Sequence, residues 1–231
     1  MSRTRFHDAL DELKDRLLRM GGIAEQSLGY AMNAYRDGDR QQCALVFETE
    51  QAINAAHREI DELALDLLAM QQPMAVDLRF IVAVIKINAD LERVGDQAVN
   101  IAQRVAEVLD LPPAELPADV PLIAGIASQM IRQSLDAFVR GDADLAQNVL
   151  VTDNDVDRMK REIEHAMLAK MHDSPEFTRQ ALDVLLIARN LERIGDHATN
   201  IAESVYYLIT GETLAGPRPK GDTSSLDQVD S

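Results

Sequence analysis

LERVGDQAVNIA at residues 91–102 returns as LERIGDHATNIA at residues 191–202, and this repeated stretch decides the fold. Nine of the twelve positions are identical, and the two copies are 100 residues apart. Apolar residues recur every three or four positions around both copies, which is the period of an amphipathic helix. The repeat therefore predicts two similar helical halves.

Each copy carries a polar stripe along one side of its predicted helix. The members, four residues apart, are Glu92, Asp96 and Asn100 in the first copy, and Glu192, Asp196 and Asn200 in the second. Like charges at this spacing disfavour a helix by roughly 0.2–0.5 kcal/mol. The glycine inside each copy costs about 1 kcal/mol relative to alanine. Because both unfavourable features occur twice, we interpret the stripes as an oxygen-rich metal site that is built in each half.

Six long helices are expected, three in each half. They cover about residues 6–35, 40–70 and 77–109, then about 122–139, a segment ending near 171, and a segment from 175 to about 209. Gly38-Asp39 and Gly141-Asp142 each provide a helix stop followed by an N-cap. Ser174 is expected to cap the last helix, with Pro175 at its first position. No segment alternates with period two for long enough to form a strand.

The predicted fold class is therefore all-α, with two tandem, pseudo-symmetric three-helix bundles. The first bundle occupies residues 1–110 and the second 120–210. Residues 111–119 contain three prolines and are the expected linker. Residues 211–231 are rich in Gly, Pro, Ser and Asp, and we expect a disordered tail.

The middle helix of each half carries a second polar stripe. Its members are Glu50, Asn54, His57 and Asp61 in the first half, and Asp153, Asp157 and Glu164 in the second, at an offset of 103. If the two stripes of a bundle face each other, oxygen ligands converge from two helices. Carboxylate and amide oxygens suit divalent or trivalent Fe, Mn, Mg or Ca, and zinc is less natural without Cys and with little His. The alternative is that the acids form an ordinary solvated helix face.

Four arginines also recur at an offset of 100. They are Arg93 and Arg193 beside the acids, and Arg79 and Arg179 near the starts of the same helices. Each pair has two interpretations, a surface ion pair of little energetic value or a contact with an anion or a partner.

Composition excludes several classes of function. The net charge of −16 argues against nucleic acid, because phosphate backbones are held by Lys and Arg. Cys43 is the only cysteine, so no disulfide can form within the chain, as in a reducing cytoplasm. The N-terminus lacks the apolar core of a signal peptide, and no run of about 18 apolar residues could span a bilayer. We expect a cytoplasmic protein, without a catalytic triad or phosphate loop.

The sequence resembles the PhoU family of phosphate-signalling proteins over about residues 6–210. The resemblance rests on Asp77-Leu78-Arg79, the doubled LER[VI]GD segments, the Gly-Asp turns, Glu50-x-x-x-Asn54 and Asp153-x-x-x-Asp157. It implies metal bound by Glu92 with Asp96, by Glu192 with Asp196 and by Asp153 with Asp157. Glu50-x-x-x-Asn54 departs from the all-acid form of the family, so the first site is expected to bind more weakly or to hold fewer ions.

The resemblance also implies an adaptor rather than an enzyme. Family members restrain phosphate-starvation signalling by contacting a membrane sensor histidine kinase and the ATPase side of the Pst phosphate transporter, usually as dimers. Two alternatives remain open from the residues alone. One is a carboxylate-bridged metalloenzyme, which only His57, His165 or His197 could assist, and the other is a structural or metal-storing bundle.

Overall fold

The computed structural model describes residues 3–70, 73–112, 117 and 119–214. Its helices are α1 (Arg3–Asp37), α2 (Arg40–Met70), α3 (Ala75–Asp110), α4 (Asp119–Arg140), α5 (Ala143–Asp173), the short 3₁₀ helix η1 (Pro175–Phe177) and α6 (Thr178–Thr210). None of these described residues lies in a β-strand. The all-α prediction is confirmed. Most of the expected tail, residues 215–231, lies outside the described residues.

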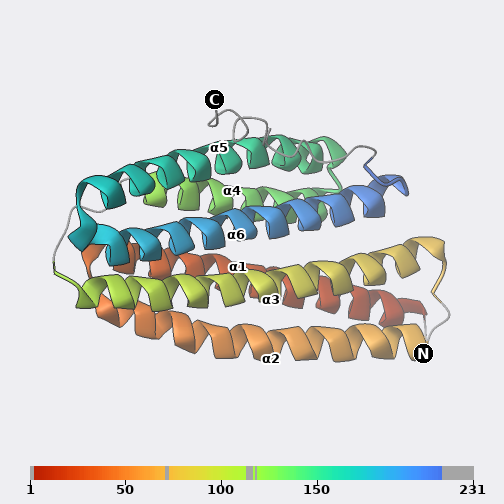
Figure 1. The fold of residues 1–231 in the computed structure, drawn as a ribbon. Coiled ribbons are helices and arrows are strands. Elements are labelled where there is room, and N and C mark those ends of the chain that lie inside the picture. The colour runs from red at the N-terminus through yellow and green to blue at the C-terminus, as the bar shows by residue number, and fades with distance from the viewer. Residues whose placement is uncertain (1–2, 71–72, 113–116, 118, 215–231) are drawn as a thin grey trace.

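The helices form two bundles that lie against each other. In one bundle α1, α2 and α3 pack together, and in the other α4, α5 and α6 do so. Figure 1 shows α3 and α6 side by side in the middle of the molecule, with α2 and α5 on their outer sides. The contact between α3 and α6 is the most extensive of any helix pair, and α1 with α4 adds a smaller one.

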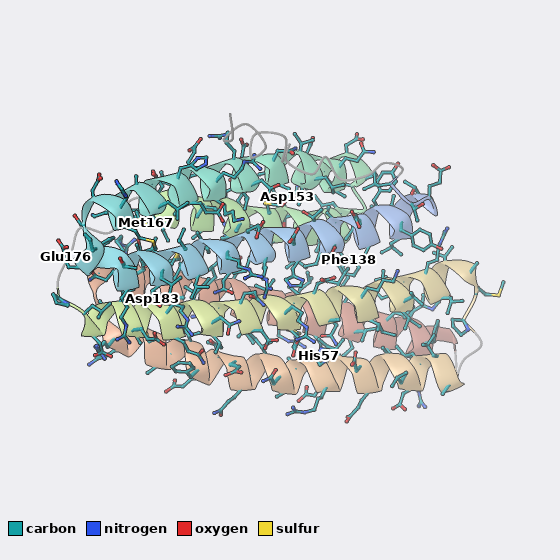
Figure 2. All side chains as sticks on the ribbon, viewed as in Figure 1. His57, Phe138, Asp153, Met167, Glu176 and Asp183 are labelled. Atoms are coloured by element: carbon teal, nitrogen blue, oxygen red, sulfur yellow. The ribbon has the colours of Figure 1, made fainter. Side chains whose placement is uncertain are left out.

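The apolar stripe of every long helix faces a core that is continuous across both bundles. Its largest side chains are aliphatic and fully buried; they include Leu13, Leu17, Ile53, Ile81, Leu91, Ile101 and Ile123. The Phe80 ring on α3 stacks on Phe138 of α4, with the ring centres 5.6 Å apart. The apolar interiors of the two bundles are therefore connected through the α3–α6 contact. Polar side chains cover the outer faces (Figure 2).

The two Gly-Asp turns fold as the sequence predicts. Gly38 and Gly141 have φ of +69° and +64°, which favours glycine, and each ends a helix. Oδ1 of Asp39 accepts a hydrogen bond from the Gln41 amide at 2.9 Å, and Oδ1 of Asp142 accepts one from Leu145 at 2.9 Å. These caps fix the sharp reversals that make neighbouring helices antiparallel.

The helix ends differ from the expectation in two places. α4 begins at Asp119 rather than near residue 122. Ser174 precedes the 3₁₀ helix η1 instead of opening α6 directly, and its side chain makes no capping hydrogen bond. Phe177 of η1 is buried, and its ring lies 4.3 Å from the Lys170 ammonium. Burial of this ring explains why the chain takes an extra turn before α6.

No helix among the described residues is both long enough and apolar enough to cross a membrane.

Candidate metal-binding face

The glycine of each repeated segment lets two helices approach closely. A Cβ on Gly95 of α3 would lie 2.8 Å from Cδ1 of Ile53 on α2. A Cβ on Gly195 of α6 would lie 3.1 Å from Oδ1 of Asp153 on α5. These glycines therefore allow close helix packing. The packing brings the polar stripe of α2 alongside that of α3, and the stripe of α5 alongside that of α6.

In the first bundle the register of α2 against α3 is fixed by Asn88. Its buried side-chain amide donates to Oδ1 of Asp61 at 2.9 Å and to the His57 carbonyl at 3.0 Å. Because the helices are antiparallel, moving one turn along α3 from Asn88 brings Glu92 level with His57. The α2 and α3 stripes therefore run side by side.

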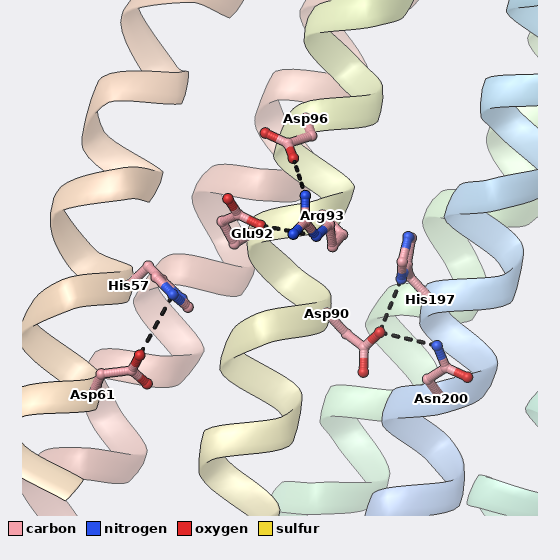
Figure 3. A network of polar contacts seen from close by, with 8 residues as sticks. All are labelled: His57, Asp61, Asp90, Glu92, Arg93, Asp96, His197 and Asn200. Atoms are coloured by element: carbon pink, nitrogen blue, oxygen red, sulfur yellow. Dashed lines mark hydrogen bonds and ion pairs between the residues drawn. The ribbon is translucent and has the colours of Figure 1, made fainter. Parts of the chain in front are cut away.

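An arginine partly neutralises the acidic pair of α3. Nε of Arg93 lies 3.4 Å from Glu92, and its Nη1 donates to Asp96 at 3.0 Å. The two acids are about one-quarter to one-third exposed, at 23% and 32% of their side-chain surface. Figure 3 shows both carboxylates turned toward Arg93, with His57 and Asp61 on the neighbouring helix. Of the two interpretations of Arg93, an ion pair or a contact with an anion or partner, the structure shows the ion pair.

In the second bundle a lysine of α5 takes that role. Lys160 occupies the place of His57 at the offset of 103. Its ammonium lies 2.9 Å from Glu164 on its own helix and 3.7 Å from Glu192 on α6. Arg193, the counterpart of Arg93, is exposed. The two bundles thus neutralise equivalent acids from different positions.

The charges around Glu192 shift its protonation equilibrium. Burial raises the pKa of Glu192 above its ordinary value; the Lys160 ammonium opposes this rise, and Asp196, Asp157 and Glu164 add to it. Burial would lower the pKa of Lys160, but its hydrogen bond to Glu164 and the neighbouring acids outweigh burial and raise it. Three neighbouring carboxylates and one ammonium thus act on Glu192, and negative charge prevails around it.

The remaining predicted residues lie on the same two pairs of helices. Glu50 and Asn54 are half-buried on α2, and Asp153 and Asp157 are half-buried on α5. Asn100 is half-buried on α3, one turn beyond Asp96. In the described part of the chain, no three side chains of His, Cys, Asp or Glu are placed to hold a metal ion as they stand. A bound ion would require side chains to turn toward it.

Asn200 and His197 serve the contact between the bundles. Nδ1 of His197 lies 2.9 Å from Oδ1 of Asp90 on α3, and the Asn200 side chain donates to the same oxygen at 3.0 Å (Figure 3). Sequence reasoning missed this cluster. A signal existed, because Asp90 is Asn190 in the second half and His197 is Gln97 in the first. The two residues that differ from their counterparts in the other half, Asp90 and His197, therefore contact each other between the bundles.

Arg79 and Arg179 lie at opposite ends of the α3–α6 contact. A side chain on Gly211 would collide with Nη1 of Arg79, so this guanidinium rests on the C-terminal end of α6. Arg179 is exposed at the start of α6, and its charge acts on Asp183. Neither arginine lies on the carboxylate stripes.

The fold and this face define a class of protein: an all-helical, internally duplicated pair of three-helix bundles with paired carboxylate stripes in each half. The PhoU domain model matches residues 17–105 and again 120–205, which are the two bundles. The chain belongs to the PhoU family.

Curated relatives agree along most of the chain. A protein of Pseudomonas aeruginosa named "Phosphate-specific transport system accessory protein PhoU homolog" is 39% identical over 209 residues, 89% of this chain and 86% of the relative. A Rhizobium meliloti protein of the same name is 36% identical over 97% of this chain and 95% of its own.

Two crystal structures have the same architecture. PhoU from Pseudomonas aeruginosa superposes with a TM-score of 0.86 at 38% identity, covering 90% of this chain and all of that one. The phosphate transport system regulatory protein PhoU from Streptococcus pneumoniae gives a TM-score of 0.84 at 28% identity, covering 91% and 99%.

Proposed function

We propose that this chain is a cytoplasmic negative regulator of phosphate uptake and homeostasis, and that it acts by binding other proteins rather than by catalysis. The observation that carries the proposal is the match of both bundles to the PhoU domain model. The relatives named as accessory proteins of the phosphate-specific transport system support the same role.

The partners in this proposal are the sensor histidine kinase of the phosphate regulon and the ATPase side of the Pst transporter. Long rigid helices with an acidic face suit docking by charge and shape, since complementary charge gives specificity and fast association. In the proposal the chain acts as a homodimer, as the family resemblance implies. It restrains starvation signalling when phosphate is plentiful.

We further propose that the stripes bind hard metal ions. The first site would use Glu50, Asn54, Glu92 and Asp96, and the second Asp153, Asp157, Glu192 and Asp196. The donor chemistry fits, because all of these side chains offer oxygen. The excess negative charge around the partly buried Glu192 also favours a bound cation. A bound divalent ion would supply positive charge that neutralises the face before a partner carboxylate approaches.

The test is a deletion strain carrying a phosphate-regulated reporter at high external phosphate. Loss of this chain should make the reporter constitutive, and the wild-type gene should restore repression. If Glu92→Ala with Asp96→Ala fails to restore repression, the first stripe acts in regulation. Glu62→Ala with Asp66→Ala is the matched control, because it removes two exposed acids at the same spacing from α2.

Three other results would count against parts of the proposal. An unchanged reporter in the deletion strain would favour metal storage or catalysis. Oxygen consumption or phosphatase activity by the metal-loaded protein would favour the metalloenzyme. Repression that survives after the stripe variants have lost their metal would make the ions structural.

A further inference from the structure

A cavity of about 680 Å³ opens between α3 and α6 at the end of the molecule where α6 terminates. Its walls include Val82 and Lys86 of α3, Ser204 and Tyr207 of α6, and Leu214 just beyond α6. It lies away from the carboxylate stripes, which face α2 and α5. Its volume falls within the range of roughly 300–1,000 Å³ that small-molecule sites in proteins occupy.

The pseudo-symmetry explains why a cavity exists at this end. At the opposite end of the α3–α6 contact, Arg104 of α3 reaches Asp183 of α6, with Nη1 3.5 Å from Oδ1. The counterparts of these two residues at the offset of 100 are Ser204 and Ala83. Two long or charged side chains are thus replaced by two small ones. The Arg104–Asp183 ion pair therefore fills one end of the interface, whereas the small side chains of Ser204 and Ala83 leave the other end open.

The open end retains positive charge. Arg79 and Lys86 are seven residues apart and lie on the same side of α3, where Lys86 lines the cavity. Nε of Arg79 is buried and has no hydrogen-bond partner within the described structure. A buried donor without a partner is unfavourable, so an acceptor at this position would be stabilising.

The other residues of the cavity wall indicate which class of ligand the cavity can bind. Ser204, Thr213 and Tyr207 add three hydroxyl groups, and Glu203 is the one carboxylate among the described wall residues. The wall hydroxyls and the Lys86 ammonium match the acceptor oxygens of a phosphate group. Arg79 is not itself a wall residue, but it lies seven residues from Lys86 on the same side of α3, and its guanidinium rests beside Gly211, two residues before the wall residue Thr213. Val82, Leu214 and the Tyr207 ring provide apolar surface, and a nucleobase can stack on an aromatic ring. The Glu203 carboxylate can accept hydrogen bonds from ribose hydroxyls.

We propose that this cavity binds a mononucleotide, with the phosphate held by Arg79 and Lys86 and the base against Tyr207. Inorganic phosphate alone would leave most of the volume and the apolar wall unused. The site is independent of the proposed metal stripes. It would give a phosphate-regulating protein a second input, the level of a phosphorylated metabolite.

The experiment is isothermal titration of AMP into the full-length protein, with inorganic phosphate as a second probe. AMP should bind at least tenfold more tightly than phosphate. Arg79→Gln and Lys86→Gln should each weaken AMP binding at least tenfold. Arg179→Gln is the matched control, because it removes the equivalent charge from the opposite end, and it should change affinity less than twofold.

Ser204→Arg separates a shaped site from simple charge attraction. It places the side chain of the counterpart Arg104 in the cavity, so it should lower AMP affinity at least tenfold although it adds a positive charge. Circular dichroism confirms that each variant is folded, and Mn²⁺ uptake should stay at the wild-type level. The proposal is overturned if phosphate binds as tightly as AMP, if Arg79→Gln behaves like Arg179→Gln, or if Ser204→Arg tightens binding.

Discussion

At the scale of single residues, the two halves differ most in the cation that accompanies the acids. Arg93 lies on the same helix as the two acids it contacts, whereas Lys160 reaches Glu192 from the neighbouring helix. The i, i+4 spacing predicted which acids share a helix face. It could not predict which cation would meet them, because that depends on rotamers and on the register between helices.

If the second stripe binds a metal ion as proposed, Lys160 competes with that ion for the acids of the second bundle. A partly exposed ion pair is worth up to about 1 kcal/mol, so Lys160→Gln should tighten Mn²⁺ binding at that site roughly fivefold. Lys170→Gln removes the same charge from α5 at a position outside the stripe, and it should change affinity much less. Calorimetric titration of the two variants measures the difference. Equal affinities would show that Lys160 does not occupy the ion's position.

Asp183 makes stability depend on pH in a direction unusual for an aspartate. Burial, followed by the nearby Glu107 charge, raises the pKa of Asp183 above its unfolded value, although Arg104 and Arg179 oppose the rise. The folded state therefore holds this proton more tightly than the unfolded state. The contribution of Asp183 to the free energy of unfolding should fall as pH rises above about 4.

Urea unfolding of wild type and Asp183→Asn between pH 3.5 and 7 tests this sign. The variant should gain stability relative to wild type as pH rises. Asp37→Asn is the contrasting control, because the hydrogen bond from Arg36 lowers the pKa of Asp37. Asp37 should stabilise the fold at neutral pH and lose that contribution as pH falls. A pH-independent difference for Asp183→Asn would contradict the expected shift.

At the scale of helices, composition and spacing were sufficient to predict the six long elements. The Gly-Asp turns marked two helix boundaries correctly, because positive φ and a side-chain cap are both local requirements. The 3₁₀ helix before α6 was not predictable in this way. It exists because Phe177 is buried by tertiary contacts, which no local pattern reports.

Two helical glycines, Gly29 at an open position and Gly95 at a packed one, give opposite expectations. Gly29→Ala has open space around its new Cβ, so it should stabilise α1 by roughly 0.5–1 kcal/mol. Gly95→Ala would press on the buried Ile53, and overpacking of this kind costs roughly 1–3 kcal/mol. Thermal unfolding should therefore rank Gly29→Ala above wild type and Gly95→Ala below it. Adding Ile53→Val should recover part of the loss; without any recovery, the close contact is not its cause.

At the scale of the whole molecule, the repeat predicted two matching halves but not how they meet. The contact uses α3 and α6, and both helices bury apolar side chains along their copy of the repeated segment. Asp90 with His197 near the middle and Arg104 with Asp183 at one end then make the interface asymmetric. These pairs form between residues that differ from their counterparts in the other half. A prediction based on the similarity of the two halves therefore does not find them.

This architecture predicts that the first bundle alone will pair with itself. A fragment of residues 1–112 exposes the α3 surface that α6 covers in the whole chain. A second copy of α3 could cover this surface instead, because nine of the twelve residues in the repeated segment are identical in α3 and α6. Burying that face again by forming a symmetric dimer is favourable, because the same patch meets itself across a two-fold axis. Analytical ultracentrifugation should therefore find a dimer.

One substitution tests whether this dimer reproduces the native contact. In the fragment dimer Asp90 would face Gln97 of the second copy instead of His197, so Gln97→His should restore the carboxylate–imidazole pair on both sides of the axis. Because the pair is partly buried, the dimer should tighten severalfold, and more at pH 6 than at pH 8, where the imidazole is less protonated. A folded monomeric fragment, or a dimer insensitive to Gln97→His, would mean that α6 contributes something to the interface that the repeat does not encode.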